Sequence, residues 1–174
     1  MHFFFPRRVL AVIFSALLGV VAFSTVAGTA SADVWARQVS WDDFASMTIK
    51  DDEAWPSSDV VEKHSLAAQK PFFVTAVNPV QTRTITRCTG DEVRVELHMR
   101  VELIWADQVR VTGTAYMYEG ASCTSNDLDG TKSFAYTIAN NRTLRPSPIE
   151  LPNVEEGGDM AYIQLSLTNT SSAI

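Results

Sequence analysis

The segment from 93 to 105 alternates apolar and polar side chains along its whole length. Every odd position is apolar, and every even position except Ile104 is polar. Side chains of a β-strand point alternately to the two faces of a sheet, so the pattern predicts one long strand with a buried face and a wet face. On a helix the same apolar residues would surround the whole circumference. The chain is therefore constrained to build a sheet that is covered on one side.

A second alternating segment follows almost at once, from 109 to 118, and the two segments together predict an antiparallel hairpin. A two-residue turn would pair Leu103 with Arg110 and mix the two faces. We therefore expect a three-residue loop that pairs Trp105 with Val109, because this register keeps apolar side chains opposite one another.

Four further segments are rich in β-forming residues or alternate with a period of two. They are residues 71–77, 82–88, 132–138 and 160–169. Short strands separated by turn signals, with little helix, favour an all-β fold. We expect an antiparallel β-sandwich, Ig-like or jelly-roll-like, whose core is formed by residues 71–174, and an open barrel is the alternative.

Residues 33–70 are less regular, and we expect a peripheral segment that is helical or irregular. Ser40, with acids in the positions that follow, fits the start of a short helix. Residues 57–69 fit either a helix or an edge strand.

The first 32 residues have the three parts of a secretory signal peptide. Arg7 and Arg8 form a positive region, residues 9–27 are nearly all apolar, and residues 30–32 supply small side chains for cleavage. We expect cleavage after Ala32, which leaves a single domain of residues 33–174 with no membrane anchor. An uncleaved membrane helix is the alternative. The sequence thus predicts a secreted, extracellular protein.

The exported domain is acidic. The chain has 14 basic and 20 acidic residues, and cleavage removes Arg7 and Arg8, which leaves 12 against 20 and a net charge of −8. Such a domain, without a basic cluster, repels phosphate groups, so we expect neither nucleic acid nor an anionic membrane surface as a partner.

Cys88 and Cys123 are the only cysteines, and both lie in the exported part. Two cysteines of a folded domain in an oxidising compartment usually pair, so we predict a disulfide between them. In the expected register it ties the start of the strand at 93–105 to the end of its hairpin partner.

No sequence motif for catalysis is present, so we expect no enzyme. His98 lies on the polar face between Glu96 and Arg100, where a ladder of opposite charges accounts for it. No serine has a Gly-x-Ser-x-Gly setting, and no pair of histidines or cysteines has a metal-binding spacing. A small secreted hydrolase that uses His64 or His98 is kept as an alternative.

The segment after Cys123 is rich in acids and amides. Asn126, Asp127 and Asp129 precede Gly130. Asp127 and Asp129 fit positions three and five of an EF-hand loop, but Ser125 stands at position one and Tyr136 where that loop needs a bidentate glutamate. We therefore expect an ordinary turn. The side chains of Asn126, Asp127 and Asp129 are weak candidates for a structural calcium ion, and no other cofactor is expected.

Aromatic side chains offer two candidate binding surfaces. Tyr116 and Tyr118 share a face with His98, and in the expected register His98 lies opposite Tyr116. Open to water, this face would be an aromatic and polar platform for sugar rings or a protein partner; covered, the tyrosines would be packing residues. Tryptophans at 35, 41 and 55 either cap one end of the fold or form a partner-binding patch.

Two Asn-x-Ser/Thr sequons, at Asn141 and Asn169, matter only in a host that glycosylates. Taken together, the sequence favours a secreted, non-catalytic domain that binds an extracellular protein, for example as an inhibitor. A carbohydrate-binding module with structural calcium is the first alternative, and the hydrolase is the second.

Overall fold

The structure is a computed structural model that describes residues 35–52, 58–153 and 158–172. The predicted signal peptide, residues 1–32, and Trp55 lie outside the described residues. Within the described ranges, no helix is long and apolar enough to cross a membrane.

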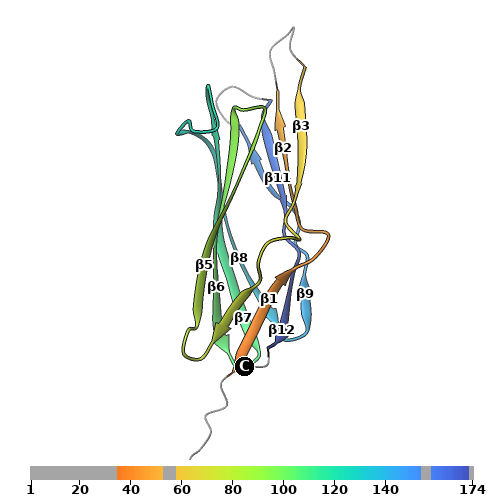
Figure 1. The fold of residues 1–174 in the computed structure, drawn as a ribbon, viewed down its shortest axis with the longest axis vertical. Coiled ribbons are helices and arrows are strands. Elements are labelled where there is room, and N and C mark those ends of the chain that lie inside the picture. The colour runs from red at the N-terminus through yellow and green to blue at the C-terminus, as the bar shows by residue number, and fades with distance from the viewer. Residues whose placement is uncertain (1–34, 53–57, 154–157, 173–174) are drawn as a thin grey trace, which may run out of the picture. The chain divides into compact units, whose positions relative to one another are not determined.

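Twelve strands account for the regular structure of the described residues (Figure 1). They are β1 Ala36–Trp41, β2 Ser46–Asp51, β3 Val60–Ser65, β4 Phe72–Thr75, β5 Val80–Thr89, β6 Val93–Trp105, β7 Gln108–Glu119, β8 Asp127–Ala139, β9 Arg142–Leu144, β10 Ile149–Pro152, β11 Met160–Gln164 and β12 Leu167–Ser171. They form three four-stranded antiparallel sheets, which confirms the prediction of an all-β antiparallel fold. Sheet A has the order β4-β1-β12-β9, sheet B the order β10-β11-β2-β3, and sheet C the order β5-β6-β7-β8.

Sheets A and B have matching strand orders. Each strand of sheet A is joined by a short corner to the strand of sheet B in the corresponding position, as β1 is to β2 and β12 is to β11. The single strand expected at 160–169 is therefore two strands. Leu165 and Ser166 between them are both buried, so the alternation shifts by one residue and the chain changes sheet.

The short helix expected from Ser40 is wrong. The chain forms β1 and β2 there, and the side chains of Val39, Met47 and Ile49 are fully buried, so this segment belongs to the core rather than to the periphery. The acids that suggested a helix start occupy the corner between the strands, where Asp42 Oδ1 accepts a hydrogen bond from the amide of Phe44 at 2.9 Å. This is an Asx turn, which uses the same residue types as a helix cap.

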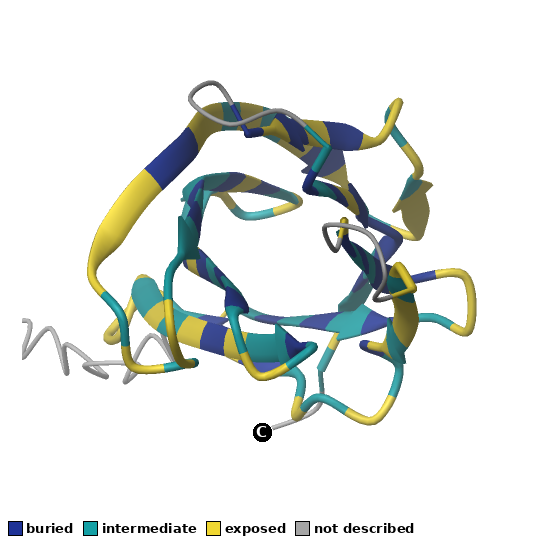
Figure 2. Ribbon diagram, turned by 90° about the horizontal axis from the view of Figure 1, so that it is seen from above, coloured by how far each residue is buried: buried dark blue, intermediate teal, exposed yellow. Residues whose placement is uncertain are grey.

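Residues 60–65 form β3 at the edge of sheet B, so the edge-strand alternative for this segment is confirmed. The strand at 93–105 is also confirmed, with the bounds expected from its alternation. Its odd positions from Val93 to Val101 are buried in the core, and Figure 2 shows the alternation as bands of buried and exposed residues along the strands. Trp105, the last residue of the strand, is 70% exposed because the strand runs past the end of the core.

The register expected for the hairpin is wrong by two positions. Leu103 pairs with Val109, and the turn consists of Ala106 and Asp107 alone. The apolar faces still match, because the register shifts between Leu103 and Trp105 and leaves Ile104 without a partner. A bulge of this kind absorbs the one residue that a two-residue turn would otherwise misplace.

A hydrogen-bonded cluster holds the corners together. The carboxylate of Asp42 accepts hydrogen bonds from Ser166 Oγ at 2.6 Å and from Arg145 Nη2 at 2.9 Å. Arg145 also stacks on the ring of Phe44, with 4.1 Å between Cζ and the ring centroid. Burial raises the pKa of Asp42, but the hydrogen bonds from Ser166, Arg145 and the Phe44 amide outweigh burial and hold that pKa below its ordinary value of 3.8.

We expect the change Asp42→Asn to lower the free energy of unfolding at pH 7 by about 1 kcal/mol, because it weakens hydrogen bonds to a charged acceptor. A carboxylate whose pKa is lowered by folding stabilises the fold above its unfolded-state pKa, and this stabilisation is lost as the pH falls through the folded-state pKa. The difference between wild type and variant should therefore shrink below about pH 4. Urea unfolding at several pH values measures it, with Asp43→Asn, an exposed neighbour, as the control. A difference that stays constant down to pH 2 would contradict this role.

Candidate functional site

The even positions of β6 form the middle row of the outer face of sheet C. Arg94, Glu96, His98, Arg100 and Glu102 lie opposite Tyr118, Tyr116, Thr114, Thr112 and Arg110 of β7. On their other side they lie opposite Cys88, Thr86, Thr84, Thr82 and Val80 of β5. All of these residues are half-buried or exposed, so the face is open to solvent.

Four side chains form a row of stacked groups on this face. The guanidinium of Arg94 lies over the ring of Tyr118, with 4.4 Å between Cζ and the centroid. The rings of Tyr118 and Tyr116 stack at 6.3 Å, and the ring of His98 meets Tyr116 edge-on at 5.0 Å. The structure thus brings together the three residues expected to bind, although His98 pairs with Thr114 and reaches Tyr116 diagonally.

The carboxylate of Glu96 fixes both ends of this row. Its Oε1 forms an ion pair with Arg94 Nε at 3.2 Å, and its Oε2 lies 2.9 Å from His98 Nε2. Arg94 Nη1 also donates to the carbonyl oxygen of Cys123 at 2.7 Å. A row whose members are held by packing and hydrogen bonds loses little conformational entropy when a ligand binds.

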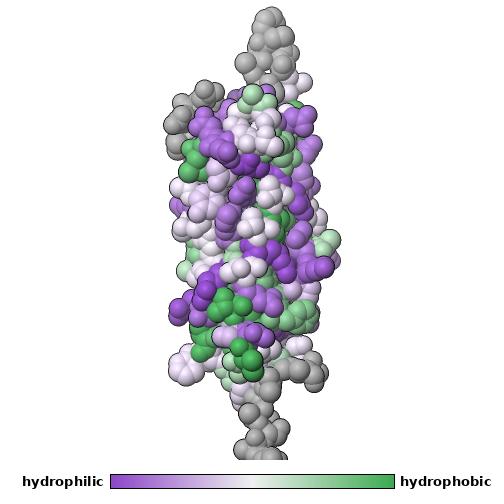
Figure 3. Space-filling model, turned by 60° about the vertical axis from the view of Figure 1, so that its left-hand side comes forward, coloured by the Kyte–Doolittle hydropathy of each residue, from purple (hydrophilic) through white to green (hydrophobic). Residues whose placement is uncertain are grey.

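A groove of about 540 Å³ lies beside the row. Its lining residues are Thr82, Arg83, Thr84, His98, Met99, Arg100, Gly113, Thr114 and Tyr116. Figure 3 brings the side of β5 and β6 forward and shows mainly hydrophilic residues over its middle, with apolar ones near its lower end.

Gly113 is required where β7 passes β6 at this groove. A Cβ at this position would collide with the carbonyl oxygen of His98 and with the ring of Phe134 on β8. The bare backbone therefore allows a close approach of the two strands beneath His98.

The groove residues Arg100, Thr82, Thr84 and Thr114 were missed as site residues by the sequence argument. Their signal was present, since the even positions of 82–86 are all threonine and the strand at 93–105 places Arg100 on the polar face. Pairing β5 with β6 brings the two sets together.

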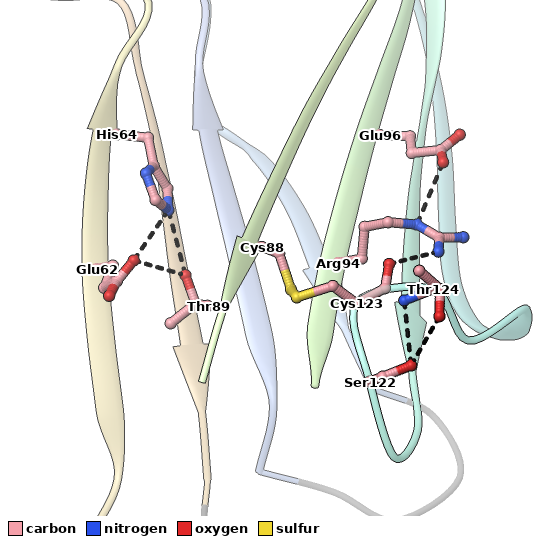
Figure 4. The surroundings of a disulfide bond; sticks show 9 residues. All are labelled: Glu62, His64, Cys88, Thr89, Arg94, Glu96, Ser122, Cys123 and Thr124. Atoms are coloured by element: carbon pink, nitrogen blue, oxygen red, sulfur yellow. Dashed lines mark hydrogen bonds and ion pairs between the residues drawn. A yellow bond between two sulfur atoms is a disulfide. The ribbon is translucent and has the colours of Figure 1, made fainter. Parts of the chain in front are cut away.

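The disulfide between Cys88 and Cys123 is confirmed, with 5.9 Å between the Cα atoms (Figure 4). Its position differs from the expected one, because Cys88 lies at the end of β5 and Cys123 in the loop between β7 and β8. The bond therefore joins two segments that both contact Arg94 of β6, because Arg94 pairs with Cys88 and donates a hydrogen bond to the carbonyl oxygen of Cys123. A disulfide of this kind points to an oxidising compartment.

His64 does not have the arrangement of a catalytic base (Figure 4). Its Nε2 lies 3.2 Å from Thr89 Oγ1 and 3.4 Å from Glu62 Oε2. A nucleophile–base–acid relay needs the hydroxyl on one ring nitrogen and the acid on the other. Here both partners meet the same nitrogen, and Thr89 is buried, so the set connects β3 to β5.

The calcium candidates lie at the start of β8 rather than in a turn. Asn126 Oδ1 accepts from Arg94 Nη2 at 3.4 Å, Asp127 is exposed, and Asp129 is the buried residue of a bulge opposite Met117 and Tyr118. In the part of the chain that the structure describes, no group of three or more His, Cys, Asp or Glu side chains could hold a metal ion.

Three apolar side chains are exposed at one end of sheets A and C. Trp35 precedes β1, Val77 lies between β4 and β5, and Trp105 ends β6; they are 49%, 76% and 70% exposed. Backbone hydrogen bonds join these segments, from Ala76 N to the Trp35 oxygen and from Leu103 N to the Pro79 oxygen. We call Trp35, Val77 and Trp105 the apolar end.

Trp41 and the asparagines of the two sequons differ in their exposure to solvent. Trp41 is a core residue, packed against Phe72 with 6.5 Å between the ring centroids. Asn169 is fully buried, and its side-chain amide donates to the carbonyl oxygen of Ile138 at 2.9 Å, so the folded domain does not present this sequon. Asn141 is exposed in the turn between β8 and β9.

Comparisons with models of protein families, with curated proteins and with solved structures find no match for this chain.

Proposed function

We propose that this protein is a secreted, non-catalytic domain that binds carbohydrate through the outer face of sheet C. The signal-like sequence of residues 1–32 and the disulfide support export. The matching strand orders of sheets A and B support a β-sandwich in which these two sheets form one bent layer over sheet C.

The observation that carries the proposal is the composition of the groove. Thr82, Thr84 and Thr114 offer hydroxyl groups, His98 and Arg100 offer planar polar groups, and Tyr116 offers an aromatic ring at one side. Sugars are bound by this combination, because their hydroxyls need hydrogen-bond partners while their C–H faces pack on aromatic rings. Regular strands place these groups at fixed spacings, so the surface is ordered before the ligand arrives.

We expect Tyr116→Ala to weaken sugar binding by about tenfold, because an aromatic contact contributes roughly 1–2 kcal/mol. The measurement uses the secreted protein on a glycan array, followed by titration of the sugars that bind. Tyr162→Ala is the matched control, since Tyr162 is a partly exposed tyrosine of β11 in sheet B. Equal losses in the two variants, or sugar binding that survives Tyr116→Ala, would contradict a site on sheet C.

A protein partner at the apolar end is the second candidate function. Tryptophan is enriched at the centres of protein interfaces, and exposed apolar side chains gathered at one end are a typical binding surface. Capture of proteins from the extracellular medium by wild type and by the Trp105→Ala and Tyr116→Ala variants tests this function. A captured protein that is lost with Trp105→Ala and retained with Tyr116→Ala would favour it. Such a result without sugar binding would replace the carbohydrate proposal.

A further inference from the structure

The lining of the groove on sheet C includes no aspartate or glutamate, although the protein is acidic. It includes two arginines, Arg83 and Arg100, and His98. The whole chain carries a net charge of −6. A region of opposite sign to the rest of the surface favours an anionic ligand at that region.

Arg83 and Arg100 differ in what their guanidinium groups contact. The guanidinium of Arg83 stacks on the buried ring of Phe72 at 4.3 Å and donates to the carbonyl oxygens of Lys70 and Pro71. Burial lowers the pKa of Arg83. This arginine therefore serves the fold and contributes to the groove mainly through its backbone.

Arg100 is available to a ligand. Its side chain is 48% exposed, and among the described residues its ion pair is with Glu102, at 3.5 Å. Glu102 also faces Arg110 across the β6–β7 pair, so one carboxylate is flanked by two guanidinium groups. The nearest acid on the other side, Glu96, already contacts Arg94 and His98. Arg100 and Arg110 together therefore carry one positive charge more than Glu102 can balance.

We propose that the groove binds an acidic polysaccharide, with the negative group of one sugar on the guanidinium of Arg100. The negative group is a uronate carboxylate or a sulfate ester, both of which match the planar fork of arginine. The hydroxyls of the same sugar meet Thr82, Thr84 and Thr114, and the chain passes Tyr116. This inference rests on the proposed function, since it names the class of sugar that the site takes.

The test uses the secreted protein and four probes in calorimetric titrations. The probes are an oligogalacturonate, its methyl ester, a sulfated galactan oligomer and a neutral cello-oligosaccharide. We expect at least one acidic probe to bind about tenfold more tightly than the neutral probes, because one charge-assisted contact is lost without the anion. Weak binding of the methyl ester identifies the carboxylate as the group recognised, and preference for the galactan identifies the sulfate.

Arg100→Gln should lower the affinity for the preferred acidic probe about tenfold and the affinity for neutral sugar by less, because glutamine keeps a planar amide donor but carries no charge. Arg142→Gln, on the exposed strand β9 of sheet A, is the matched control. Thermal melting verifies that both variants are folded. Equal binding of acidic and neutral probes, with no effect of Arg100→Gln, would overturn the acidic specificity and leave the carbohydrate function intact. If none of the probes binds and the glycan array is also blank, both proposals fail.

Discussion

Replacing Cys88 and Cys123 together with serine should lower the free energy of unfolding by about 4 kcal/mol. The bond joins residues 35 positions apart, and loop closure of that length costs the unfolded chain about this much conformational freedom. A domain of this size has a total stability of roughly 5–15 kcal/mol, so the loss is a large fraction of it. Urea unfolding of the secreted protein measures the effect.

The local consequence should reach the binding face. The carbonyl oxygen of Cys123 holds Arg94, and Arg94 stacks on Tyr118 at the end of the aromatic row.

Wild-type protein in a reducing agent is the control and should unfold at the same urea concentration as the double variant. An unfolding midpoint that reduction leaves unchanged would show that the bond contributes nothing to stability.

Phe72→Ala should lower the free energy of unfolding by about 3–5 kcal/mol, the usual cost of deleting a fully buried aromatic side chain. The ring of Phe72 is inaccessible to solvent, packs against Trp41 and supports the guanidinium of Arg83. Its removal leaves a cavity and takes away the surface on which a partly buried charge rests.

The neighbouring residue supplies the control for this change. Phe73 is 45% exposed on the opposite face of the same strand, so Phe73→Ala removes the same atoms without leaving a core cavity. We expect it to change the free energy of unfolding by less than about 1 kcal/mol. Chemical denaturation of both variants measures these changes. Equal losses in the free energy of unfolding would contradict the assignment of Phe72 to the core between the sheets.

Alternation allowed the strands of sheet C to be predicted because one of its faces is buried and the other is wet. The same rule failed at the corners, where Leu165 and Ser166 are both buried and the period breaks. The helix expected from Ser40 was wrong for another reason, because acids such as Asp42 suit an Asx turn as well as the first turn of a helix. Corner formation depends on tertiary packing, which no local pattern encodes.

The aromatic half of the site was predicted from the sequence, and the polar half was missed although its residues alternate in the same way. Tyr116, Tyr118 and His98 lie on neighbouring strands of one hairpin, so period two alone places them on one face. Thr82 and Thr84 belong to β5, whose pairing with β6 depends on the turn that contains Gly90 and Asp91. Both residues have positive φ, 64° and 65°, and the loop consists of residues 90–92, because Thr89 pairs with Val93. A hairpin with a loop of this length places Thr84 opposite His98.

The hairpin register shows why a turn length cannot be chosen from face matching alone. Both a three-residue loop and a two-residue turn with a bulge keep apolar residues opposite one another. The structure has the second arrangement, which shifts every pair by two positions. The face is unchanged, but the partner of each side chain is different, so Glu96 rather than His98 lies opposite Tyr116.

Amide NMR locates the surface of the protein that contacts the ligand. The probe is the acidic oligosaccharide that binds most tightly in the titrations, added stepwise to the isotopically labelled secreted protein. We expect the largest shifts at Thr84, His98 and Thr114, with the amides around Trp105 unmoved. Shifts confined to the apolar end, or none on sheet C at saturating ligand, would contradict a carbohydrate site on the outer face of sheet C.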